Sequence, residues 1–122
     1  MNIWHLTTDA PRLPDRVSPG ERIILHFGTW PIELGQEVEV IYWVEHIDRT
    51  TRRGQVEAIW RYNNRGNSYW QAEIGPFAQG DHVAYAAYGR SRGGGDATPA
   101  SCFRCDDTHV CCKVEEHTVH IT

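Results

Sequence analysis

The stretch Asn63–Tyr85, NNRGNSYWQAEIGPFAQGDHVAY, decides the fold class of this chain. It holds a glycine-bearing turn, an alternating stretch centred on Trp70, a second turn rich in glycine and proline, and another alternating stretch. Alternation of apolar and polar residues with period two is typical of a half-buried β-strand. Glycine, proline, asparagine and aspartate are typical of the turns between strands. The stretch therefore predicts paired antiparallel strands of the β-hairpin type.

Strand-like runs with the same pattern continue on both sides of this stretch. Turn residues separate them, for example Pro19-Gly20 and Arg53-Gly54. The predicted strands cover residues 2–6, 22–27, 37–46, 55–63, 68–74, 82–88 and 117–122. No apolar repeat of 3.6 residues reaches helical length. The sequence thus predicts an all-β chain, an antiparallel two-sheet sandwich of the immunoglobulin or fibronectin type with six to eight strands.

Alternation also assigns side chains to the two faces of each strand, because neighbouring side chains point in opposite directions. In each run the uncharged set is expected to face the core, so Val56, Trp60 and Tyr62 share the inner face. The residues expected to be largely buried are Val40, Tyr42, Ala58, Trp60, Trp70, Ile74, Val83 and Tyr85. The apolar and aromatic residues expected on outer faces are Ile41, Trp43, Ile59, Tyr69 and Tyr88.

Length and charge exclude several classes of protein. The 122 residues are enough for one domain, 1–122, with a core of its own. The net charge is −4 and the charges are interspersed, so neither nucleic acid nor an anionic membrane is an expected partner. No run approaches the ~20 apolar residues of a membrane span. The N-terminus lacks the pattern of a secretory signal, so the chain is expected to be cytoplasmic if complete, or else a piece of a larger protein.

Residues 90–116 interrupt the regular succession of predicted strands and turns. This segment carries the glycine run Gly93–Gly95 and all four cysteines of the chain, and it predicts an irregular Gly/Cys-rich insertion before the last strand. Cysteine and histidine in C-x-x-C and H-x-x-H spacing are typical of zinc ligands and make this segment a candidate zinc site. The candidate ligands are Cys102, Cys105, Cys111, Cys112, His117 and His120. Free thiols or local disulfides are the alternative, and in a strand His117 and His120 would point to opposite faces.

Several of these features together resemble a known family. They are Trp30-Pro31 before a strand, Trp70 at the centre of a strand, the turn Gly75–Phe77, Gly80-Asp81 at the start of the next strand, and Tyr85 near its end. The pattern resembles the immunoglobulin-like accessory domains, similar to carbohydrate-binding modules, found at the N-termini of some bacterial glycoside hydrolases. The resemblance covers residues 17–89. Related modules often close with a strand soon after the tyrosine, whereas here the insertion comes first. The chain holds no glycosidase catalytic domain, so the resemblance implies no activity.

The first hypothesis for function is therefore a non-catalytic module that binds a polysaccharide or oligosaccharide. Exposed aromatic rings stack on the apolar face of a sugar ring, and neighbouring polar side chains bind its hydroxyls. The predicted contacts are Trp30, Trp43, Tyr69, Asn64 and Asn67.

Two alternatives to sugar binding remain open at this stage. One is a protein-interaction module, docking onto a catalytic or other partner protein, with a metal- or redox-dependent Cys/His loop. The other is a small thiol enzyme built on Cys102 and His109. The carboxylates fall on expected solvent faces and no phosphate-binding loop is present, so an enzyme is not predicted.

Overall fold

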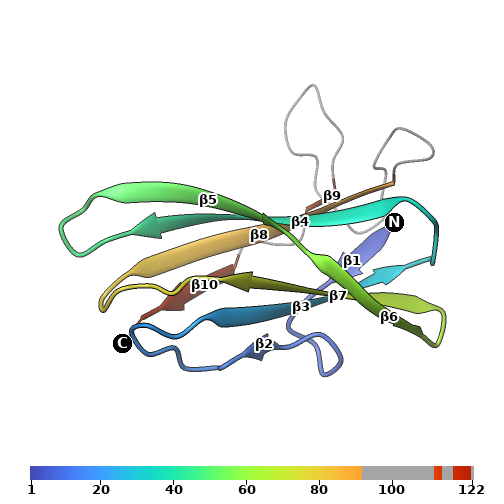
Figure 1. Cartoon of the computed structure of the whole chain (residues 1–122), viewed down its shortest axis with the longest axis horizontal. Helices are drawn as coiled ribbons and strands as arrows, with labels where there is room; N and C mark the ends of the chain where they lie inside the picture. Colours follow the sequence, from blue (N-terminus) through green and yellow to red (C-terminus); the bar gives the residue numbers. More distant parts are fainter. Residues whose placement is uncertain (92–111, 114–116, 122) are drawn as a thin grey trace.

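Ten β-strands and no helix form the part of the chain that the computed structural model describes, residues 1–91, 112–113 and 117–121. The strands make two five-stranded antiparallel sheets that lie one over the other (Figure 1). The predicted all-β sandwich is confirmed. The strand count exceeds six to eight because one predicted run divides in two and short strands are added beside β3 and β8. In this described part, no helix is long and apolar enough to cross a membrane.

Each sheet has a continuous path of four strands and one short strand beside it. The first sheet runs in the order β1 (Asn2–Trp4), β3 (Ile23–Trp30), β7 (Asn67–Ile74) and β6 (Ile59–Asn64), with β2 (Arg12–Leu13) beside β3. The second sheet runs in the order β10 (His117–His120), β8 (His82–Ser91), β4 (Gln36–Glu45) and β5 (Thr51–Glu57), with β9 (Cys112–Lys113) beside β8. Strands β8 and β9 therefore extend into the predicted insertion 90–116, most of which lies outside the described residues.

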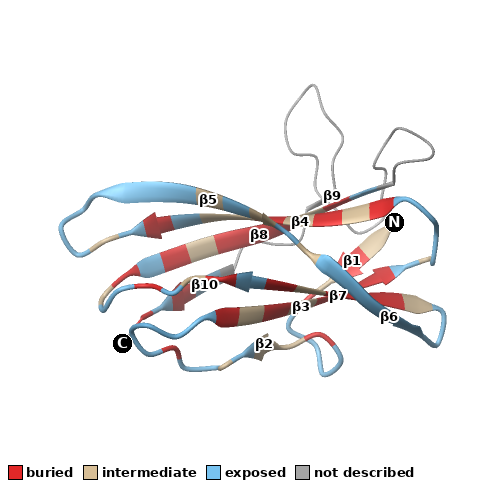
Figure 2. Ribbon diagram, in the orientation of Figure 1, coloured by how far each residue is buried: buried red, intermediate tan, exposed pale blue. Residues whose placement is uncertain are grey.

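The core lies between the two sheets, where the inner faces of the long strands meet (Figure 2). Period-two alternation is visible along β4, in which Val38, Val40 and Val44 are buried and Trp43 and Glu45 are exposed. The core residues from the other strands and connections include Val17, Ile23, Leu25, Phe27, Trp70, Ala72, Ile74, Phe77, Val83, Tyr85, Ala87, Val119 and Ile121. Of the eight residues expected to be largely buried, Val40, Trp70, Ile74, Val83 and Tyr85 are confirmed, and Tyr42 and Ala58 are half-buried.

The predicted run 55–63 does not form one strand but crosses from the second sheet to the first. It leaves β5 at Glu57 and enters β6 at Ile59, and the backbone N–H of Ala58 between them donates to the Val38 carbonyl. Figure 1 shows this crossing as the green ribbon that passes from the upper layer to the lower one. The predicted turn at Arg53-Gly54 is wrong, because these residues lie within β5. Gly54 instead makes room for the ring of Tyr42, which would lie 2.1 Å from an added Cβ.

Trp60 is the clearest error in the expected core, because its side chain is 51% exposed. Trp60 pairs with Trp70 and Tyr62 pairs with Tyr69, so one extra residue, Arg61, forms a β-bulge in β6. The bulge reverses the alternation after Trp60 and sends Tyr62, expected to face inward, to the outer face of the sheet. Trp60 keeps the inner face, but β6 is the edge strand of its sheet, with a neighbouring strand on one side only in the described part of the chain.

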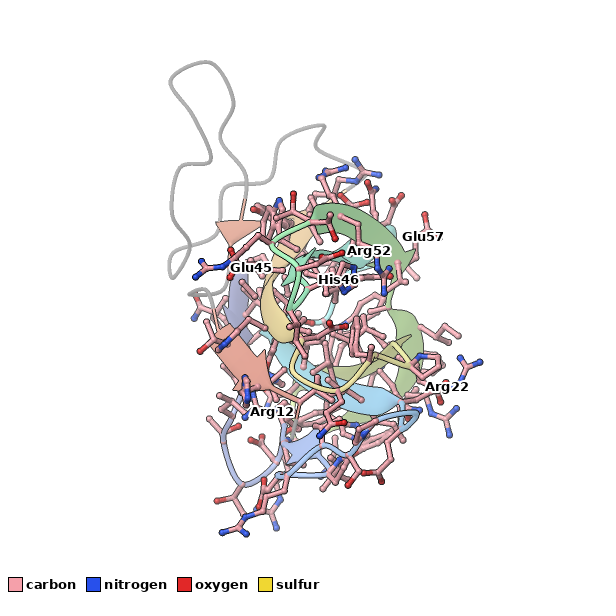
Figure 3. All side chains as sticks on the ribbon, turned by 90° about the vertical axis from the view of Figure 1, so that its left-hand side faces the viewer. Arg12, Arg22, Glu45, His46, Arg52 and Glu57 are labelled. Carbon is pink, nitrogen blue, oxygen red and sulfur yellow. The ribbon has the colours of Figure 1, made fainter. Side chains whose placement is uncertain are left out.

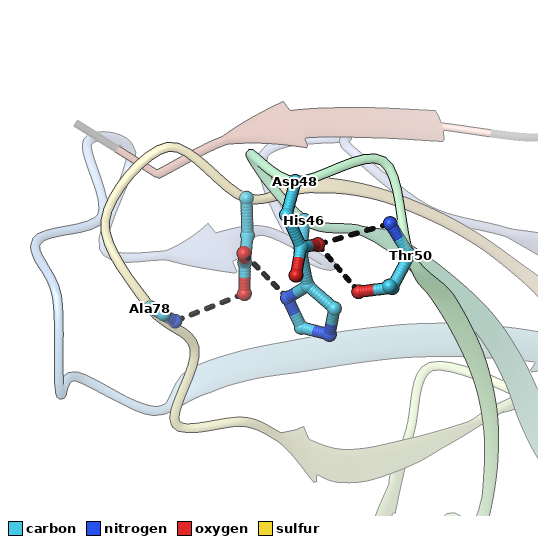
Figure 4. Close-up of polar contacts among 5 residues, drawn as sticks. His46, Asp48, Thr50 and Ala78 are labelled. Carbon is cyan, nitrogen blue, oxygen red and sulfur yellow. Dashed lines mark hydrogen bonds and ion pairs between the residues drawn. The ribbon is translucent and has the colours of Figure 1, made fainter.

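A buried aspartate holds the turn before β8 in place (Figure 4). The Asp81 carboxylate is 1% exposed, accepts a hydrogen bond from the Ala78 backbone N–H at 3.0 Å, and lies 2.7 Å from His46 Nδ1. The backbone carbonyl of Asp81 accepts from the Ile121 N–H. Asp81 therefore joins the turn before β8 to the end of β4 and to the last described residue of the chain.

Candidate functional site

The outer face of the second sheet carries Trp43, one of the predicted sugar contacts. The strand register places Thr118, Ala84, Trp43 and Arg53 side by side across four strands, and His120, His82, Glu45 and Thr51 in the next such row. Residues in one row of an antiparallel sheet have their Cβ atoms about 5 Å apart, so the two rows form one continuous surface.

A cleft of about 580 Å³ lies over these rows. Trp43, 36% exposed, forms one wall, and the small side chain of Ala84 keeps the centre low. The cleft is lined by Trp43, Val44, Glu45, Thr51, Arg52, Arg53, His82, Val83, Ala84 and Thr118. We name it the outer-face cleft. Its lining combines one indole with the small side chain of Ala84 and several polar side chains.

Polar side chains around the outer-face cleft are available to a ligand. Within the described part of the chain, neither Glu45 nor Arg53 forms a side-chain hydrogen bond or an ion pair. The rings of His82 and His120 lie against each other with centroids 4.3 Å apart. Figure 3 shows Glu45 and Arg52 in the layer of the second sheet, apart from Arg12 and Arg22 in the layer of the first. The surface therefore offers a carboxylate, a guanidinium, imidazoles and hydroxyls beside one indole.

The five predicted sugar contacts do not come together in one site. Trp43 lies in β4 of the second sheet, whereas Trp30, Asn64, Asn67 and Tyr69 belong to the first sheet, around the β6–β7 turn and the end of β3. That turn is a two-residue hairpin in which Arg65 and Gly66 both have positive φ, 52° and 82°. Trp30 is 52% exposed and is not among the described residues that line the outer-face cleft.

Tyr69 is not an exposed aromatic, although it lies on the outer face as expected. Its exposed fraction is 7%, because the N-terminal segment covers it. The Trp4 ring meets it edge-on with a centroid distance of 6.4 Å, and Tyr62 stacks on it at 5.1 Å. Gly28, its register partner on β3, allows the approach of Trp4, whose ring would lie 2.2 Å from a Cβ at that position. Tyr69 is therefore unavailable for sugar stacking.

A short hydrogen bond joins Tyr69 to the same N-terminal segment. The Tyr69 hydroxyl donates to Asp9 Oδ2 at 2.6 Å, and the Thr7 hydroxyl donates to Asp9 Oδ1 at 2.6 Å. The bonds from Thr7 and Tyr69 lower the pKa of the Asp9 carboxyl, and the bond to Asp9 raises the pKa of the Tyr69 hydroxyl. These shifts favour the charged Asp9 carboxylate and the neutral Tyr69 phenol. The hydrogen bond between these two forms keeps the N-terminal segment against Tyr69.

Sequence reasoning missed most of the residues around Trp43. Arg53 was assigned to a turn, and Ala84, His82 and Thr118 were given no role. Alternation along the run 82–88 also puts His82 and Ala84 on the face opposite to Val83 and Tyr85. Only the register of β8 and β10 against β4 shows that this is the face of Trp43.

The predicted metal site lies mostly outside the described residues. Cys102, Cys105 and Cys111 fall there, together with His109 of the thiol-enzyme alternative. In the described part, Cys112 belongs to β9, and His117 and His120 pair with Tyr85 and His82 on β8. No group of three or more histidine, cysteine, aspartate or glutamate side chains in this part could hold a metal ion. Zinc binding by the cysteine segment therefore stays a prediction.

The comparisons with known proteins point to large bacterial sugar-processing enzymes. No family model matches the sequence. The isomaltosyltransferase of Sporosarcina globispora is 34% identical over 87 residues, which is 71% of this chain and 7% of that enzyme. The cycloalternan-forming enzyme of Listeria monocytogenes, solved in complex with a pentasaccharide substrate, matches 99% of this chain with a TM-score of 0.75 and 25% identity.

A second structure from Listeria monocytogenes gives the same result. It is an uncharacterised protein in complex with α-D-glucose, β-D-glucose, magnesium and calcium, and it matches 99% of this chain with a TM-score of 0.76 and 25% identity. The matched region covers 10% of each Listeria chain, so this chain spans only a small part of its relatives. The family resemblance in the sequence is confirmed: this chain matches a small, domain-sized part of large bacterial glycan-processing enzymes, as an accessory β-sandwich domain of a glycoside hydrolase does.

Proposed function

We propose that this domain binds a gluco-oligosaccharide in the outer-face cleft. The observation that carries the proposal is the position of Trp43, a partly exposed indole beside the low floor at Ala84, with Glu45 and Arg53 within the same lining. An aromatic face buries the apolar C–H face of a pyranose ring. Placed polar groups around such a ring select the pattern of its hydroxyls.

The relatives support the class of ligand. One is an isomaltosyltransferase, and another was solved with a pentasaccharide substrate. This chain corresponds to less than two thirds of either protein, so their activities belong to the whole enzymes. The role proposed for the domain is to hold a saccharide of the same chemical class.

We also propose that the domain is not catalytic. Cleavage of a glycosidic bond usually requires two carboxyl groups that flank the bond. Glu45 is the one carboxylate among the described residues that line the outer-face cleft. The cleft therefore has the groups for binding a sugar without the pair for hydrolysing it.

Affinity electrophoresis against soluble α- and β-glucans tests the proposal. An open cleft of this kind is expected to bind with millimolar to micromolar affinity, about −4 to −8 kcal/mol. Wild-type protein should be retarded by a glucan, and Trp43→Ala should be retarded less with an unchanged melting temperature. Trp30→Ala is the matched control, because Trp30 is similarly exposed but lies outside the cleft.

Two results would contradict this function. One is the absence of retardation by any glucan, and the other is equal retardation of Trp43→Ala and wild type. The absence of retardation would favour the runner-up function, in which the same surface docks onto a partner protein. Equal retardation would show that the glucan binds outside the outer-face cleft.

A further inference from the structure

A second cleft opens between the two sheets at the other end of the sandwich from the β4–β5 turn. It has a volume of about 570 Å³, and its lining residues come from the β3–β4 connection, the start of β4 and the β6–β7 hairpin. Figure 1 shows these elements at one end of the sandwich. Its lining consists of Ile32, Glu33, Leu34, Gly35, Gln36, Trp60, Asn63, Ser68 and Trp70. We name it the end cleft. It shares no residue with the outer-face cleft.

The bulge at Arg61 brings Asn63 to the same side of β6 as Trp60, and the two residues form one wall of the end cleft. Trp60 and Asn63 both point to the inner side of β6, opposite Trp70 and Ser68 of β7. Asn63 Oδ1 accepts hydrogen bonds from Trp60 Nε1 at 2.9 Å and from Ser68 Oγ at 2.8 Å. These two bonds hold the half-exposed indole of Trp60 in a fixed orientation. They also identify which atom of the Asn63 amide is the oxygen. The Nδ2 group therefore points away from Trp60 and Ser68 and can act as a donor.

Gln36 supplies a buried acceptor on the facing sheet. The residue is 8% exposed, and its Nε2 donates to the Pro31 carbonyl at 2.9 Å. A carbonyl oxygen only accepts, so this bond fixes the amide orientation and leaves Oε1 as an acceptor. Gln36 Oε1 is buried and receives no hydrogen bond within the described structure. Buried polar atoms are nearly always satisfied, so this acceptor indicates a missing donor, such as a ligand hydroxyl or a water that the ligand orders.

We propose that the end cleft is a second saccharide site, with Trp60 as the stacking platform and Gln36 and Asn63 as hydroxyl-binding groups. Among the described residues that line the end cleft, Glu33 is the only charged one and none is a cation. This composition disfavours phosphates and carboxylates and favours a neutral polyhydroxylated ligand. The choice of a saccharide as the ligand rests on the proposed function. The location of this second site rests on residues that do not line the outer-face cleft. Two sites at opposite ends of one domain would bind two segments of a glucan chain, which raises avidity without any new contact.

Two-dimensional NMR with isomaltotriose as the probe tests this site. In wild-type protein, the Trp60 indole N–H and the Gln36 side-chain NH₂ signals should shift saturably as the sugar is added. In Trp60→Ala the Gln36 shift should be lost, while the Trp43 indole shift remains. Tyr62→Ala is the matched control, because Tyr62 is equally exposed on the opposite face of the same strand, at 52%. It should keep the Gln36 shift.

The outcomes separate this proposal from the outer-face one. Shifts at Trp60 and Gln36 without any shift at Trp43 would support the end cleft and contradict the outer-face site. Unmoved Trp60 and Gln36 signals at tens of millimolar sugar would overturn the end cleft, whatever happens at Trp43. A Gln36 shift of unchanged size in folded Trp60→Ala would also overturn it, since the indole would then play no part.

Discussion

Trp60 and Trp70 stand directly opposite each other in the register of β6 and β7, yet Trp60 is 51% exposed and Trp70 is 7% exposed. Both rings face the inner side of the sheet. Trp70 lies in an interior strand, and its Nε1 donates to Thr29 Oγ1 at 2.9 Å, whereas Trp60 lies in the edge strand beside the end cleft. The same residue type on the same face therefore has a structural role in one strand and a surface role in the other.

Substitution of the two tryptophans should separate these roles. Trp70→Ala should lower the free energy of unfolding by about 3–5 kcal/mol, because it removes a large core aromatic. Trp60→Ala should lower it by about 1 kcal/mol or less, as for a residue that is only partly packed. Urea denaturation of both variants, followed by far-ultraviolet circular dichroism, measures the difference. Equal losses in the two variants would show that Trp60 belongs to the core after all.

Among the carboxylates of the sandwich, Asp81 should be the one whose substitution lowers the stability most. Asp81→Ala removes a buried carboxylate and leaves the Ala78 N–H without its acceptor and His46 without its partner, so it should cost about 1–3 kcal/mol of unfolding free energy. Asp48→Ala is the control in the neighbouring turn, where an exposed carboxylate accepts from the Thr50 N–H and hydroxyl. Thermal unfolding of both should show a clear loss only for Asp81→Ala, and a similar loss in both would contradict the assigned role.

The contact between the N-terminal segment and Tyr69, made through Asp9, should become weaker at low pH. Hydrogen bonds from Thr7 and Tyr69 lower the pKa of Asp9 in the folded state, so its stabilising contribution is present above the unfolded pKa of about 3.9. The contribution is lost as the pH falls through the lower, folded pKa. The difference in stability between wild type and Asp9→Asn should therefore be constant at neutral pH and shrink at low pH. Urea unfolding across this range measures it, and a difference that does not vary with pH would contradict the account.

The alternating pattern predicted the strands and faces that follow simple geometry. In β4, β7 and β8 the buried set was assigned correctly at Val40, Trp70, Ile74, Val83 and Tyr85. These strands have regular registers and, for the most part, neighbours on both sides, so a side chain on the inner face is also a buried one.

The predictions are wrong where the burial of a side chain depends on features of the fold other than the local alternation of residues. A single extra residue, Arg61, reverses the alternation in β6, and the edge position of that strand exposes Trp60. Tyr69 is buried by a segment more than 50 residues away in sequence, through Trp4 and Asp9. The outer-face cleft joins residues from four strands, and only the register between those strands brings them together. Single-sequence alternation contains no information on any of these three features.

Calorimetric titration with isomaltotriose decides whether Trp43 and its neighbours bind a saccharide. The titration is best made in the Trp60→Ala background, so that the end cleft does not contribute. In that background we expect saturable binding with a dissociation constant between micromolar and millimolar. Added Trp43→Ala should abolish the binding heat, and added Trp30→Ala should leave it unchanged. No binding heat in the Trp60→Ala background, or the same affinity after Trp43→Ala is added, would contradict the claim.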